Sequence, residues 1–194
     1  TFSGAYAEVN GAFNISRNTL APGPGKLLCP WARSNEPGYR NGGNKFDLQK
    51  WDDRYFTRLK AFVAAAGQRN IIVEFTFFCP LYEDTLWTLS PMNSMNNVNG
   101  LPRIARTDVY TMDKNGGLLQ FQEKMVQKIV EELKDFDNVM YEICNEPYFG
   151  GVQLEWQRHI AGVISETERS FPGRHLITQH LPNGYSKIAH PTPA

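Results

Sequence analysis

Residues 138–147 read Asn138-Val139-Met140-Tyr141-Glu142-Ile143-Cys144-Asn145-Glu146-Pro147. The first seven of these form a short hydrophobic run, which predicts a buried strand. The strand passes directly into the tripeptide Asn145-Glu146-Pro147. Pro147 has no backbone N–H to donate and restricts the residue before it to extended geometry. It therefore predicts both the end of the strand and the direction of the Glu146 side chain.

Strands and helices alternate on either side of this run. Residues 70–78 and 175–179 are expected to form further strands, and a first strand is expected at residues 2–9. Three segments between the strands have apolar side chains at helical spacing: residues 51–66, 118–133 and 155–170. Such alternation is typical of a parallel sheet with right-handed crossovers, so the predicted fold class is α/β.

Each expected helix has one apolar face. In residues 51–66, which Asp52 is expected to cap, the face contains Tyr55, Leu59, Phe62, Val63 and Ala66. In residues 118–133 it contains Leu118, Phe121, Met125, Val126, Ile129, Val130 and Leu133. In residues 155–170 it contains Trp156, Ile160, Val163 and Ile164.

Two connections, residues 10–50 and 79–117, are much longer than the others. Both follow an expected strand and precede an expected helix. In parallel α/β folds this end of the sheet holds the ligand site, and loops far longer than about 2 to 6 residues tend to be functional. The loop lengths therefore place a site at the carboxyl ends of the strands.

Composition excludes several classes of protein. The 194 residues, 22.1 kDa in mass, include 20 basic and 20 acidic side chains, so the formal net charge is zero. This balance argues against nucleic acid and anionic membrane surfaces as partners. The longest apolar stretch, residues 71–82, contains Glu74 and Pro80 and is too short to span a membrane. We expect one globular domain over residues 1–194, and the sequence does not predict its oligomeric state.

Cysteine and histidine usage predicts neither a metal centre nor a cofactor. Cys29, Cys79 and Cys144 are too few and too widely spaced for a zinc site or a disulfide scaffold. Buried free thiols are the favoured interpretation, and one disulfide in an oxidising compartment is the alternative. The four histidines do not fall at metal-ligand spacings.

Glu146 is the strongest candidate catalytic residue. A carboxyl group held at the end of a strand, beside aromatic side chains such as Tyr148 and Phe149, suits general acid catalysis. Asn145 is placed to donate a hydrogen bond to a substrate hydroxyl. The alternative is that Glu146-Pro147 only opens the next helix, with the carboxylate interacting with the helix dipole.

The run from Tyr141 to Pro147 resembles the fourth-strand signature of clan A glycoside hydrolases, most closely the cellulase-like family 5. The resemblance implies a (β/α)8 TIM barrel and retaining hydrolysis of β-linked glycans, with an oligo- or polysaccharide as substrate. It implies that Glu146 is the acid/base and that Asn145 binds the sugar 2-hydroxyl. Secretion or a periplasmic location is suggested only by this family. The strands expected from residue 2 onward would be strands two to five of the barrel.

The chain also departs from the family pattern. The family's nucleophile is a second Glu at the end of the seventh strand, and nothing after His180 is typical of such a strand. Because a barrel typically needs about 250 residues, we expect an incomplete barrel, inactive as an isolated fragment, with the nucleophile outside this chain. Glu74 and Glu142 are expected to be interior polar groups paired with neighbours. The family's Arg near the end of strand two has no counterpart, and the third strand ends in an apolar segment where many members place a polar residue.

Seven further residues are candidates for substrate binding, because carbohydrate sites stack aromatic rings on sugars and surround them with hydrogen bonds. They are Trp31, Tyr39, Tyr82, Glu83, Trp87, Tyr148 and His180. For the loop aromatics, packing against the rim of the fold is an equally favoured alternative.

Two other classes of protein compete with a hydrolase. The first is a non-catalytic carbohydrate-binding or structural barrel protein that lacks the nucleophile. The second is a doubly wound nucleotide-binding enzyme, which is disfavoured because no glycine-rich phosphate loop follows an expected strand. Gly23, Gly25, Gly42 and Gly43 lie inside the long first connection instead.

Overall fold

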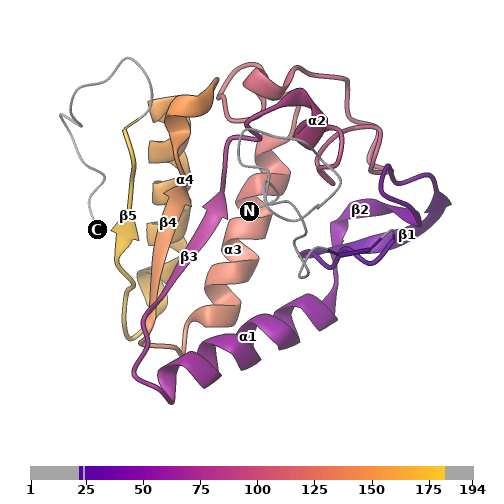
Figure 1. Ribbon diagram of the computed structural model, residues 1–194. Coiled ribbons are helices and arrows are strands. Elements are labelled where there is room, and N and C mark those ends of the chain that lie inside the picture. Colours follow the sequence, from indigo (N-terminus) through magenta and orange to yellow (C-terminus); the bar gives the residue numbers. More distant parts are fainter. Residues whose placement is uncertain (1–21, 24, 182–194) are drawn as a thin grey trace.

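The computed structural model describes residues 22–23 and 25–181 of the chain (Figure 1). The strand expected at residues 2–9 lies outside these residues. The elements are, in chain order, β1 (Trp31–Pro37), β2 (Asn44–Trp51), α1 (Asp53–Gly67), β3 (Val73–Phe78), α2 (Asp84–Trp87), the 3-10 helix η1 (Arg106–Asp108), α3 (Leu119–Leu133), β4 (Val139–Cys144), η2 (Pro147–Phe149), α4 (Leu154–Thr167), η3 (Glu168–Ser170) and β5 (Ile177–Thr178).

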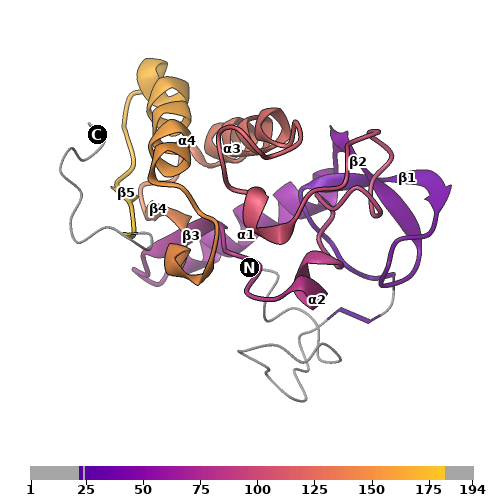
Figure 2. The same ribbon diagram turned by 90° about the horizontal axis from the view of Figure 1, so that it is seen from above.

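Strands β3, β4 and β5 form a parallel sheet in that order. Helices α3 and α4, which connect them, lie side by side on one side of the sheet, and α1 packs against α3 (Figure 2). The predicted α/β class is therefore confirmed. In the part of the chain that the structure describes, sequential strands are neighbours, and the strand order shows no reversal of the kind that marks a doubly wound sheet.

The first long connection contains a β-hairpin that the sequence analysis did not predict. Strands β1 and β2 pair antiparallel in a sheet of their own. Gly42 and Gly43, at the turn, have φ angles of 87° and 81°, which favour glycine. After the turn, Phe46 and Leu48 are 1% and 0% exposed. Their alternation with polar neighbours was a strand signal, but it lay within a segment otherwise rich in Gly, Pro and Asn.

Helix α1 begins as expected and buries most of the predicted face, since Val63 and Ala66 are buried and Tyr55 and Leu59 pack partly buried against the core. The Asp52 side chain accepts a hydrogen bond from the Arg54 N–H, which confirms the predicted cap. Phe62 is 62% exposed, so its assignment to the core was wrong, and Phe56 is buried instead. Phe56 and Val63 are buried and Leu59 between them is partly buried. These residues are three and four positions apart, so they lie on one side of the helix.

Helices α3 and α4 bear out the predicted apolar faces. All seven residues expected on the α3 face are buried, and on α4 only Val163 is partly exposed. A buried polar link joins the two helices. The Trp156 Nε1 donates to Gln122 Oε1 at 2.9 Å, and Gln122 Nε2 donates to the Val109 carbonyl at 3.0 Å. This link satisfies polar groups that would otherwise be costly in a core.

The three cysteines are buried and free, as the favoured interpretation predicted. Burial raises the pKa of Cys29 to about 12, so this thiol stays protonated at neutral pH. Among the described residues no helix combines the length and apolar character that crossing a membrane requires.

A buried ion pair fixes the start of β5. The Nδ1 of His175 lies 2.5 Å from Glu168 Oε1, and its Nε2 donates to the Phe136 carbonyl at 2.7 Å. Both ring nitrogens face acceptors, so the doubly protonated imidazole is the form that satisfies both contacts. The hydrogen bond with Glu168 raises the pKa of His175, and the partial burial of the ring opposes this rise only in part. The ring also packs on Tyr141, at 4.9 Å between centroids.

A His175→Phe substitution tests this pair, because it keeps a ring against Tyr141 but leaves the buried Glu168 carboxylate without its cation. We expect the free energy of unfolding near pH 6 to fall by about 3 to 5 kcal/mol. The raised pKa of His175 means that the pair contributes fully at low pH and is lost as pH rises through the folded value. The difference in the free energy of unfolding between wild type and variant should therefore narrow as pH rises above the ordinary histidine pKa of about 6.5, as measured by urea unfolding.

The matched control is His159→Phe. His159 contacts Glu123 at 2.5 Å, but both side chains are about one third exposed, so the loss should stay below about 1 kcal/mol. An equal loss in the two variants, or a difference between wild type and His175→Phe that does not narrow with pH, would contradict the assignment.

Candidate active site

The residues that end β4 leave the sheet in an unusual conformation. The Asn145 N–H donates to the Phe78 carbonyl at 3.0 Å and so extends the pairing of β3 with β4 by one residue. Glu146 then adopts φ 47° and ψ 52°, in the left-handed region. The expectation that Pro147 holds Glu146 extended is therefore wrong. Pro147 disfavours the right-handed helical region for the residue before it, and the chain turns through the left-handed region instead.

The Glu146 carboxylate does not cap a helix. Pro147 opens only the three-residue η2, and the Glu146 side chain makes no capping hydrogen bond there. The next α-helix, α4, begins at Leu154. The alternative in which the carboxylate interacts with the dipole of the next helix therefore has no contact to support it.

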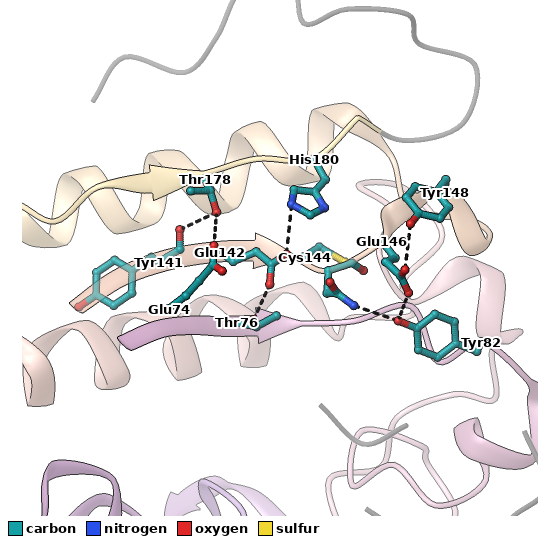
Figure 3. Close-up of polar contacts among 11 residues, drawn as sticks. Glu74, Thr76, Tyr82, Tyr141, Glu142, Cys144, Glu146, Tyr148, Thr178 and His180 are labelled. Carbon is teal, nitrogen blue, oxygen red and sulfur yellow. Dashed lines mark hydrogen bonds and ion pairs between the residues drawn. The ribbon is translucent and has the colours of Figure 1, made fainter. Parts of the chain in front are cut away.

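Two tyrosines hold the Glu146 carboxylate (Figure 3). The Tyr82 hydroxyl donates to Glu146 Oε2 at 2.8 Å, and the Tyr148 hydroxyl donates to Oε1 at 2.9 Å. Asn145 joins the same network, because its Nδ2 donates to the Tyr82 hydroxyl at 3.1 Å. Residues from the loop after β3 and from the end of β4 therefore converge on one carboxyl group.

The tyrosines differ in their surroundings. Tyr82 is partly buried and its ring meets Phe149 edge to face at 5.1 Å, whereas Tyr148 is 42% exposed. Burial first, and then the hydrogen bond to Glu146, raise the pKa of Tyr82. For Tyr148 the hydrogen bond to Glu146 is the main cause of a raised pKa. Both phenols therefore stay protonated and serve as donors at neutral pH.

Backbone strain concentrates at this site. Among the described residues other than glycine, three have positive φ: Asn70, Tyr82 at 31° and Glu146 at 47°. Asn tolerates this region, but a bulky residue there costs on the order of 1 to 3 kcal/mol. The two strained residues touch each other through the hydrogen bond described above. Such strain is a reason to look for function at this position.

A polar row crosses the face of the sheet beside the site. Thr76, Glu142 and Thr178 pair across β3, β4 and β5, so their side chains share one face. Glu142 is 5% exposed, accepts a hydrogen bond from Thr76 and lies 3.3 Å from His180 Nε2. Thr178 donates to Glu74 at 3.2 Å. Both glutamates pair with neighbours as expected, but only Glu142 is interior, and the expectation that Glu74 is an interior group is wrong because its side chain is exposed. The threonines were not predicted. Thr76 lies two residues after Glu74 and two before Phe78 in β3, and this spacing could have predicted that the three side chains share one face of the sheet.

The other predicted binding residues do not gather at Glu146. Trp31, Tyr39 and Trp87 are 2%, 3% and 7% exposed, and Trp31 lines a partly open, mainly apolar pocket of about 250 Å³ that β3 also lines. The Tyr39 hydroxyl donates to the Leu89 carbonyl, and the Trp87 Nε1 donates to the Ile104 carbonyl. In this structure the three rings pack the loops, and their stacking on sugars stays a prediction.

Glu83 and His180 also have local partners. Glu83 accepts a hydrogen bond from the Thr85 hydroxyl at 3.3 Å. His180 contacts Glu142, and its side chain is 43% exposed. No group of three or more potential metal ligands occurs within residues 22–23 and 25–181. The site that the structure assembles is thus the four-residue cluster of Tyr82, Asn145, Glu146 and Tyr148.

Parallel strands joined by helices, with a carboxylate held at the end of the middle strand, define an α/β protein with a candidate active site at the carboxyl edge of its sheet. No family model matches the chain, and neither does any curated protein. Among solved structures, it is similar to endo-glycoceramidase II from Rhodococcus sp. in a cellobiose-like imidazole complex, with 16% identity and a TM-score of 0.46 over 66% of this chain and 36% of that one. The lactosyl-enzyme intermediate of the same protein gives 15% identity and a TM-score of 0.46 over 66% and 37%.

The chain thus spans little more than a third of the length of these structures. The likeness is distant and concerns the course of the backbone only.

Glu146→Gln should change how the two tyrosines titrate. Loss of the negative charge should lower the pKa of both phenols toward the ordinary value of about 10. The change should be more complete for Tyr148, because burial keeps the pKa of Tyr82 raised. The measurement is phenolate absorbance against pH, with Tyr82→Phe and Tyr148→Phe proteins assigning the signals.

Glu131→Gln is the control, since Glu131 is exposed on α3. Titration curves for Glu146→Gln that match those of wild type would show that the phenols do not contact this carboxylate in solution.

Proposed function

We propose that the protein is a retaining glycoside hydrolase that cleaves β-linked glycans, with Glu146 as its general acid/base. The observation that carries this proposal is the placement of the Glu146 carboxylate at the carboxyl end of β4, next to Asn145 and held by two phenols. Catalytic carboxylates of barrel enzymes occupy the ends of strands in this way.

Strands β3, β4 and β5, with α3 and α4 on one side of them, are proposed to be the third to fifth strands of a (β/α)8 barrel. Their sequential order and shared helix layer fit such a barrel. The polar row that contains Thr76 and Glu142 lies on the sheet face opposite the buried Tyr141 and Ile143. In a closed barrel this face would line the interior beneath the active site.

The proposed reaction takes two steps. In the first, the glycosidic oxygen takes a proton from Glu146 as its bond to the anomeric carbon breaks, and a nucleophilic carboxylate bonds to that carbon. In the second, Glu146 accepts a proton from water while the water oxygen displaces the nucleophile. The net change is hydrolysis with retained configuration at the anomeric carbon.

The nucleophile is proposed to come from a part of the protein outside residues 1–194, with its carboxyl group about 5 to 5.5 Å from Glu146. Glu142 does not suit the role. Its side chain is 6% exposed and is engaged by Thr76 and His180. A nucleophile needs an oxygen that can reach the substrate.

Asn145 is proposed to bind the sugar 2-hydroxyl. Its amide carries two hydrogens, and the contact with Tyr82 takes one of them. That contact also orients the amide next to the acid/base. Tyr82 and Tyr148, proposed from the sequence as substrate-binding residues, are better placed to act on Glu146 itself.

Glu146→Gln in the full-length protein tests the function. Turnover of cellotetraose, mannotetraose or xylotetraose, whichever the wild type hydrolyses, should fall about 10² to 10⁴ fold, the range for a positioned general acid. The corresponding 2,4-dinitrophenyl glycosides need little acid assistance, so their glycosylation step should suffer much less. In Glu146→Ala, added azide should restore turnover of these activated substrates and yield a β-glycosyl azide.

Glu131→Gln serves as the control and should retain wild-type rates. Wild-type rates in Glu146→Gln on both kinds of substrate would overturn the assignment. A full-length protein that binds the oligosaccharides but hydrolyses none would favour a carbohydrate-binding protein instead.

A further inference from the structure

We propose that the two tyrosines on Glu146 have different tasks. Tyr82 is a positioning residue that directs the acidic proton to Oε1, and Tyr148 occupies the place on Oε1 that the glycosidic oxygen of a substrate takes. The inference rests on the acid/base role proposed above for Glu146.

The first task follows from the direction of the hydrogen bonds. The Asn145 amide nitrogen can only donate, and the Tyr82 hydroxyl accepts from it at 3.1 Å. The single proton of that hydroxyl therefore points to Glu146 Oε2, at 2.8 Å. Oε1 also accepts a hydrogen bond, from the Tyr148 hydroxyl, but that hydroxyl is exposed and can rotate to accept instead, whereas Asn145 fixes the Tyr82 proton on Oε2. The proton that Glu146 carries as an acid therefore belongs on Oε1. Tyr82 thus selects which oxygen of the carboxyl group performs the transfer.

The second task follows from access. The contact of Tyr82 with Oε2 is partly buried, and the ring is held by Phe149. The contact of Tyr148 with Oε1 is exposed, and Tyr148 itself is 42% exposed on the short η2. A ligand that arrives from solvent therefore reaches the Oε1 side and meets the Tyr148 hydroxyl there.

The exchange depends on the protonation of Glu146. A glycosidic oxygen has no proton to donate, so it can replace the Tyr148 hydroxyl only when Oε1 carries one. When Glu146 is ionised, the Tyr148 hydroxyl donates a hydrogen bond to Oε1 at 2.9 Å, and the glycosidic oxygen has no proton with which to replace that hydrogen bond. Tyr148 therefore competes with substrate most strongly at the basic end of the pH profile.

Tyr82→Phe and Tyr148→Phe in the full-length protein separate the two tasks, because each keeps its ring and loses only the hydroxyl. For Tyr82→Phe, kcat/KM on the hydrolysed tetrasaccharide should fall about 10- to 100-fold, the range for a hydrogen bond to a charged group. The basic limb of its pH profile should move to higher pH, since a donor to the carboxylate is lost. The 2,4-dinitrophenyl glycoside should be affected less.

For Tyr148→Phe, KM on the same tetrasaccharide should fall about twofold to fivefold, as expected for loss of one competing neutral hydrogen bond. The fall should be larger at basic than at acidic pH. Tyr55→Phe removes a phenol hydroxyl from α1, outside the site, and should leave both constants and the pH profile as in wild type.

Three results would overturn the inference. They are a wild-type kcat/KM and pH profile in Tyr82→Phe, a rise in KM for Tyr148→Phe, or equal losses in both variants. Each is distinct from failure of the proposed function, which would show as wild-type turnover in Glu146→Gln.

Discussion

The parallel pairing of β3 with β4 is the constraint on which the site depends. In this register Thr76 lies opposite Glu142 and Phe78 opposite Cys144, and one further hydrogen bond ties Asn145 to Phe78. A shift of one residue would move every side chain to the other face of the sheet. The polar row would then enter the core, and Glu146 would no longer face the loop that carries Tyr82.

The layer behind the sheet keeps this register in place. The rings of Phe78 and Tyr110 lie 5.1 and 4.8 Å from that of Trp156, which is fully buried on α4. The indole N–H of Trp156 is satisfied by Gln122 on α3, which also reaches the Val109 carbonyl. Two helices, a strand end and a loop thus meet in one packed cluster close to the end of β3. Sites supported by such rigid elements hold their geometry more precisely than sites on loops alone.

Much of the fold followed from periodicity, whereas the site followed only in part. The apolar faces of α3 and α4 repeat at helical spacing over several turns, and β4 is a hydrophobic run with a clear end. In these elements the local sequence pattern agrees with the tertiary structure. The β1–β2 hairpin was missed because its alternation, centred on Phe46 and Leu48, is short and sits in a loop-like composition. The exposure of Phe62 and the burial of Phe56 show that helical spacing predicts the centre of an apolar face, while its edge is decided by packing. Glu146 and Asn145 could be singled out from their position after a strand. The contact of Tyr82 with Glu146 could not, because it joins residues 64 apart in sequence through left-handed backbone conformations that no local pattern predicts.

The left-handed backbone conformations of Tyr82 and Glu146 are strained, and the hydrogen bond between their side chains offsets part of this strain. A non-glycine residue with positive φ costs on the order of 1 to 3 kcal/mol, and a hydrogen bond to a charged group contributes about 1.5 to 3 kcal/mol. The bond between Tyr82 and Glu146 is therefore comparable to the strain of one of the two backbones that it joins. The hydroxyl of Tyr82 and the backbone conformation of Glu146 therefore form one unit, because removal of the hydroxyl would leave both strained backbones in place and take away the contact that offsets part of their cost. The geometry that presents Glu146 at the end of β4 thus depends on a side chain from the loop after β3.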